Sequence, residues 1–211
     1  MYKRQELNHA AFELAPDTFD AFLGSISIGH LVLADIAARQ GDLSEVLANL
    51  DEMLAQSKRN VENEGVYGSM GHIRYIRELF AAIADQESTA DPLDIERLRR
   101  SYQTWQQALK GNITPFIHAE EQLCSDFENT KQPVAKDYLG RILATQYALW
   151  LTSLKQHDDA EAQADAVLAK CIAAIQAYES LPGADSLFHH QQPEFLPLTS
   201  DERFRAEFLP R

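Results

Sequence analysis

Apolar side chains recur three and four residues apart along most of this 211-residue chain, which is the spacing of an amphipathic α-helix. The most regular example is the series Ile95, Leu98, Tyr102, Trp105 and Leu109. No segment shows the alternation of apolar and polar residues that is typical of a half-buried strand. We therefore expect an all-α protein with about seven helices, packed as antiparallel hairpins in a helical array or an irregular bundle.

Glycine and proline are few and fall where helices are expected to begin or end. The chain contains 9 glycines and 8 prolines, and the longest stretches between them are rich in good helix formers. Prolines open three of the predicted helices, at Asp91-Pro92, Thr114-Pro115 and Gln132-Pro133. These signals predict a single all-α domain over residues 1–211, with helix pairs over roughly 16–62, 69–111, 114–156 and 159–180 and a short closing helix over 199–208.

One helix pair carries a resemblance to a known family. The stretch HLVLADIAARQGDLSEVLANLDEML, residues 30–54, resembles a tetratricopeptide unit, with Leu33, Ala34 and Ala37 at first-helix positions and Gly41-Asp42 in the turn. Residues 149–175 resemble a second unit without the glycine, and residues 197–204, PLTSDERF, resemble a segment that often closes bacterial arrays of such repeats. The resemblance covers about a third of the chain and implies stacked helical hairpins that bind other proteins.

The closing segment has its own local signal. Thr199 and Glu202 have the spacing of a capping box, in which each side chain satisfies a backbone N–H of the other residue. We expect a short helix after Thr199, with Phe204 and Phe208 turned onto the preceding helices.

The charge of the chain restricts its partners. There are 32 acidic and 19 basic side chains, giving a net charge of −13 and a pI near 4.9. Such a field opposes binding to nucleic acid or to an anionic membrane, because a phosphate binder must supply Lys and Arg. It favours a cationic protein partner, although acidic residues also serve solubility and helix N-termini.

Carboxylates gather along the second predicted helix, and two tyrosines follow it. We take these residues as the candidate partner-binding site: Asp42, Glu45, Asp51, Glu52, Glu62, Glu64, Tyr67 and Tyr75. Acidic groups would steer the approach of a basic partner, while buried aromatic anchors would supply most of the affinity. The alternative for the same carboxylates is a solvated helix face.

No motif of a catalytic or cofactor site is present. The chain lacks Gly-x-Ser-x-Gly and Cys-x-x-Cys, and residues 24–30 have two glycines of a phosphate loop but not its lysine. Cys124 and Cys171 are expected to be buried free thiols. The sequence therefore predicts no enzyme activity and no cofactor. One metal-carboxylate alternative stays open, using Glu6, His9, His118 and Glu121.

These observations favour a non-catalytic, acidic, helical protein-binding protein, most specifically an immunity or inhibitor protein that neutralises a basic toxin or effector. The alternatives are a helical-bundle metal-carboxylate protein or enzyme and a tetratricopeptide-like adaptor that binds peptides. Because the N-terminal residues lack the apolar core of a signal peptide and no apolar run approaches about 20 residues, we expect a bacterial-type cytoplasmic protein. It is expected to be a monomer or a small homo-oligomer.

Overall fold

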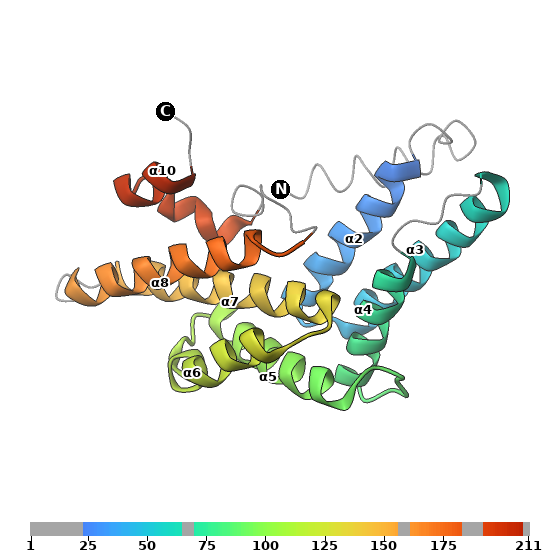
Figure 1. Cartoon of the computed structure of the whole chain (residues 1–211), viewed down its shortest axis with the longest axis horizontal. Helices are drawn as coiled ribbons and strands as arrows, with labels where there is room; N and C mark the ends of the chain where they lie inside the picture. Colours follow the sequence, from blue (N-terminus) through green and yellow to red (C-terminus); the bar gives the residue numbers. More distant parts are fainter. Residues whose placement is uncertain (1–22, 65–69, 156–160, 183–191, 209–211) are drawn as a thin grey trace. The chain divides into compact units, whose positions relative to one another are not determined.

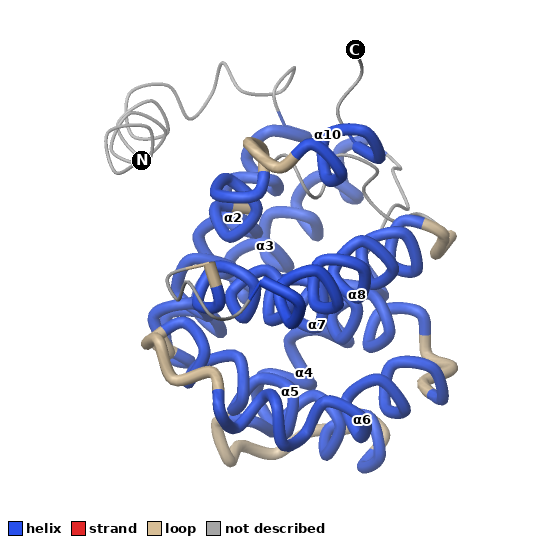
Figure 2. Tube along the Cα trace, turned by 90° about the vertical axis from the view of Figure 1, so that its left-hand side faces the viewer, coloured by secondary structure: helices blue, strands red, loops and turns tan. Residues whose placement is uncertain are grey.

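The structure is a computed structural model that describes residues 23–64, 70–155, 161–182 and 192–208 (Figure 1). These ranges contain eight α-helices and one 3-10 helix: α2 (Leu23–Gln40), α3 (Leu43–Glu64), α4 (Met70–Ile83), α5 (Pro92–Leu109), α6 (Thr114–Asn129), α7 (Pro133–Leu154), α8 (Glu161–Glu179), η3 (Pro193–Leu198) and α10 (Glu202–Phe208). No strand occurs among these described residues, as Figure 2 shows. The all-α prediction is confirmed.

The contacts between helices divide the chain into two compact units, residues 1–90 and 91–211. The first unit contains α2, α3 and α4, and the second contains the helices from α5 onward. The boundary, between Ala90 and Asp91, falls inside the predicted helix pair 69–111. The single domain predicted from the sequence stays a prediction.

In the first unit, α2 and α4 both pack against α3. The turn between α2 and α3 depends on Gly41, whose φ of 79° is left-handed and is strained for residues with a side chain. The amide of Gly41 donates to the Ala38 carbonyl and that of Asp42 to the Ala37 carbonyl, which forms a Schellman cap on α2. Asp42 also begins α3, so one turn both ends a helix and starts the next.

Small side chains let α2 and α3 approach closely. Ala34, Ala37 and Ala38 of α2 are buried, and they lie in the same unit as the buried Val46 and Leu50 of α3. The helix pair predicted on either side of Gly41 is therefore present. Residues 24–30, which have two glycines of a phosphate loop, belong to α2.

The segment that follows α4 is held by Glu78. The Glu78 carboxylate accepts hydrogen bonds from the backbone N–H of Thr89, at 2.7 Å, and from its hydroxyl, at 3.1 Å. The Ser88 hydroxyl donates to the Glu78 carbonyl at 2.8 Å. The bond from the Thr89 N–H is the main reason why the pKa of Glu78 lies below its usual value.

The hydrogen bonds from Thr89 to the Glu78 carboxylate make the stability of the protein depend on pH. Because the pKa of Glu78 is lower in the folded state, its contribution is complete above its unfolded pKa, near 4.5, and is lost as pH falls through the folded value. We expect Glu78→Gln to destabilise the protein by about 1 kcal/mol at neutral pH, because the charge-assisted bonds become neutral ones. Urea unfolding at neutral pH and at about pH 3 measures this, and the difference from wild type should be smaller in acid.

Glu87→Gln is the matched control, since Glu87 is an exposed carboxylate of the segment that follows α4 and that Glu78 holds. It should leave the unfolding curve unchanged at both pH values. A Glu78→Gln penalty that persists unchanged in acid would contradict the assignment.

The second unit is organised around α7, which packs against α5, α6, α8 and η3. Figure 1 shows α7 and α8 side by side, and Gly140 marks a point where α6 and α8 both come near α7. A Cβ atom at Gly140 would lie 2.9 Å from the Phe127 ring and 3.2 Å from the Tyr178 ring. The missing side chain at Gly140 therefore permits this three-helix contact.

Three helix starts in this unit follow the sequence prediction. Asp91 caps α5 by accepting a hydrogen bond from the Leu93 N–H, and Gln132 caps α7 through the N–H groups of Val134 and Ala135. Proline occupies the first turn of α5, α6 and α7, where its missing N–H costs nothing. The predicted end of α5 at Gly111 is also confirmed, with a left-handed φ of 85°.

The closing segment differs from the predictions in two ways. The residues before Thr199, for which no helix was predicted, include the 3-10 helix Pro193–Leu198, which packs on α7 and buries Phe195 and Leu198. The N-cap of α10 is Asp201 and not Thr199, because Asp201 accepts from the Arg203 N–H at 3.0 Å while the Thr199 hydroxyl donates to the Leu196 carbonyl. Phe204 is buried and stacks on Phe195, so the predicted docking of the closing helix is confirmed for this residue.

Candidate functional site

Four of the predicted site residues lie at the start of α3 and along its first three turns. Glu45 and Glu52 are seven residues apart and lie on the same side of the helix, and Asp51 is turned from Glu52 by about 100°. Asp42, Glu45 and Asp51 are exposed and Glu52 is half-buried. We call Asp42, Glu45, Asp51 and Glu52 the acidic face of α3.

At the start of this face, two carboxylates bond to neutral donors. Asp42 accepts a hydrogen bond from the Glu45 N–H at 3.0 Å and so caps α3. Glu45 accepts from the side-chain amide of Asn49 at 3.0 Å. The buried Asn49 also lies 3.0 Å from His30 Nδ1 of α2, and this polar contact between α2 and α3 was not predicted from the sequence. Because amide donors carry no net charge, Asp42 and Glu45 keep their negative charge at the surface.

Asp51 differs because a cation neutralises it. Arg77 of α4 donates from Nε to Asp51 at 3.0 Å and from a terminal nitrogen at 3.4 Å. This hydrogen bond is the main cause that raises the pKa of Arg77. Arg77 also lies 3.6 Å from Glu78. The charge that the acidic face of α3 offers a partner thus comes mainly from Asp42 and Glu45.

The remaining predicted site residues do not join this face in the described part of the chain. Tyr75 is half-buried on α4 and lies two residues, about 200° around the helix, from Arg77. Glu62 and Glu64 belong to the last turns of α3, but their side chains fall outside the described residues, as does the whole of Tyr67. Trp105, from the regular apolar series of α5, is only 4% exposed and is a core residue of the second unit.

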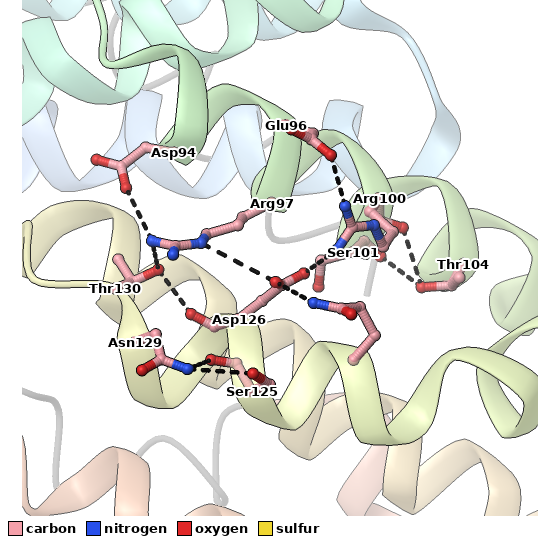
Figure 3. A network of polar contacts seen from close by, with 11 residues as sticks. Asp94, Glu96, Arg97, Arg100, Ser101, Thr104, Ser125, Asp126, Asn129 and Thr130 are labelled. Carbon is pink, nitrogen blue, oxygen red and sulfur yellow. Dashed lines mark hydrogen bonds and ion pairs between the residues drawn. The ribbon is translucent and has the colours of Figure 1, made fainter.

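A polar network joins α5 to α6 in the second unit (Figure 3). At its centre is Asp126, whose side chain is 6% exposed and accepts hydrogen bonds from Arg100 at 2.6 Å and Gln122 at 2.9 Å. Arg97 lies 3.9 Å from the same carboxylate and donates to the Thr130 hydroxyl at 3.2 Å. The network fixes α6 against α5. It also neutralises Arg97 and Arg100, which would otherwise add positive charge to the surface.

A second cluster joins α6, α7 and α8 around Glu120. One oxygen of Glu120 accepts from the Tyr147 hydroxyl at 2.7 Å and from the Lys170 ammonium at 2.6 Å. The Cys124 sulfur lies 3.3 Å from the same hydroxyl. Burial is the main cause that raises the pKa of both Cys124 and Tyr147, so neither group is activated as a nucleophile at neutral pH.

Cys171 is more deeply placed than Cys124. It is fully buried on α8, and burial raises its pKa to about 12. Both cysteines are free thiols, as predicted, but Cys124 is half-buried where full burial was expected.

These environments predict an order of thiol reactivity. In the native protein, iodoacetamide at about pH 8 should label Cys124 slowly and Cys171 only as the protein unfolds, because the thiolate is the reactive form. Peptide mapping over time gives both rates, and protein unfolded in guanidinium is the control, in which both should react rapidly. Fast labelling of Cys171 in protein with a native circular dichroism spectrum would contradict the assignment.

The residues of the predicted metal alternative are divided. His118 and Glu121 lie one turn apart on the exposed side of α6, whereas Glu6 and His9 fall outside the described residues. Within the described ranges, no three His, Cys, Asp or Glu side chains come together in a way that could hold a metal ion.

Comparison with known proteins finds no relative: no family model, no curated protein and no solved structure matches the chain. Among the helices described, none combines the length and the apolar character that crossing a membrane requires.

Proposed function

We propose that this chain is a non-catalytic protein-binding protein whose partner is cationic, and that the acidic face of α3 is the main contact region. The single observation that supports this most is that many of the few basic side chains already pair with carboxylates of the same chain, so the charge left for a partner is negative. Within the described ranges, at least eight of them lie within ion-pair distance of a carboxylate of the same chain: Arg39, Arg77, Arg97, Arg100, Arg141, Lys155, Lys170 and Arg203.

Net charge alone does not favour one unit over the other. Residues 1–90 contain 14 acidic and 7 basic side chains, and residues 91–211 contain 18 and 12, so the surplus is nearly equal. Local arrangement is what favours α3, because Asp42 and Glu45 combine exposure, neutral donors and a rigid helix start. A group of fixed carboxylates accelerates encounter with a basic surface.

The specific form that we favour is an inhibitor or immunity protein that covers a basic toxin or effector. It is supported by the acidity of the chain and by the absence of a catalytic motif from its sequence. An inhibitor of this kind has one partner, bound tightly, whereas an adaptor has several partners bound weakly. Net charge and fold class are equally compatible with an adaptor, so the experiment must separate the two by the number of partners.

The test is affinity capture with the full chain, from a lysate of the organism that encodes it, at about 50 mM and about 500 mM salt. We expect one basic protein, retained in stoichiometric amount at low salt and reduced at high salt. The complex must then re-form from the two purified proteins. Retention of many proteins in small amounts would favour the adaptor, and retention of no basic protein would contradict the proposal.

A further inference from the structure

We draw no further inference here: the strongest candidate, the exposed side of the apolar helix α2 around Val32, is a helix face for which nothing in the structure shows what covers it.

Discussion

Replacing Asp126 with alanine is expected to destabilise the protein by about 2–4 kcal/mol, because one guanidinium nitrogen of Arg100 and the amide of Gln122 lose their acceptor. This cost is lower than the roughly 3–5 kcal/mol typical of breaking a fully buried ion pair. Arg97 and Arg100 are 22% and 32% exposed, so water can solvate them in part, and Arg100 keeps its bond to Glu96 at 2.7 Å. Urea unfolding followed by circular dichroism should show a lower midpoint with an unchanged slope.

Asp126→Asn is the matched control for this change. It keeps the shape of the side chain and one acceptor oxygen but removes the charge, so its unfolding midpoint should lie between those of wild type and Asp126→Ala. Superimposable curves for wild type and Asp126→Ala would show that the network does not hold α6 to α5.

The second large effect is expected at Phe116, which is fully buried on α6. Its ring meets Tyr147 edge-on at 5.2 Å between centroids and Trp150 at 6.0 Å. Phe116→Ala removes both contacts and leaves a cavity, so we expect a loss of about 3–5 kcal/mol in the free energy of unfolding. The near-ultraviolet circular dichroism of the aromatic cluster should weaken at the same time.

Phe116→Leu serves as the control because it keeps most of the buried volume. Its cost should stay below about 1.5 kcal/mol. Equal midpoints for the alanine and leucine variants would mean that the site collapses without a cavity, and the account of the α6–α7 core would then be wrong.

Helix boundaries were the most predictable part of the fold, because they depend on local chemistry. Proline after a capping residue begins α5 and α7, and glycine with positive φ ends α2 and α5. Each of these signals acts within a few residues of the boundary that it sets. They could therefore be read without knowing how the helices pack.

The 3-10 helix over Pro193–Leu198 and the cap at Asp201 were not predicted correctly, for two different reasons. A six-residue 3-10 helix is too short to show periodicity, and its two prolines are typical of a linker. At α10, both Thr199 and Asp201 precede the helix closely enough in the sequence to be its N-cap. The choice between them depends on the Thr199 hydroxyl, which bonds to Leu196.

In the candidate site too, local spacing predicts some features, and others depend on how the helices pack. Helical spacing alone places Glu45, Asp51 and Glu52 toward one side of α3. It does not reveal that Arg77, 26 residues away, neutralises Asp51, or that Arg100 reaches Asp126 over the same separation. Such pairs depend on which helices are neighbours, and the spacing of residues within one helix does not predict which helices pack together.

The proposal that the acidic face of α3 engages a cationic partner can be tested by comparing two variants of equal net charge. In the first, Asp42→Asn, Glu45→Gln and Glu52→Gln are combined, and asparagine at 42 keeps the cap of α3. The control combines Glu87→Gln, Glu121→Gln and Glu128→Gln, all exposed carboxylates outside α3. Both variants should retain the circular dichroism spectrum of the wild type, and a small loss of stability in the α3 variant is expected because the bonds to residues 42 and 45 become neutral ones.

The decisive measurement is the association rate constant of each variant with the captured partner, as a function of salt. We predict that the α3 variant associates at least about tenfold more slowly than wild type at low salt and depends less on salt, while the control changes little. Equal slowing of both variants would show that net charge alone acts, and an unchanged rate for the α3 variant would contradict the assignment of the binding face.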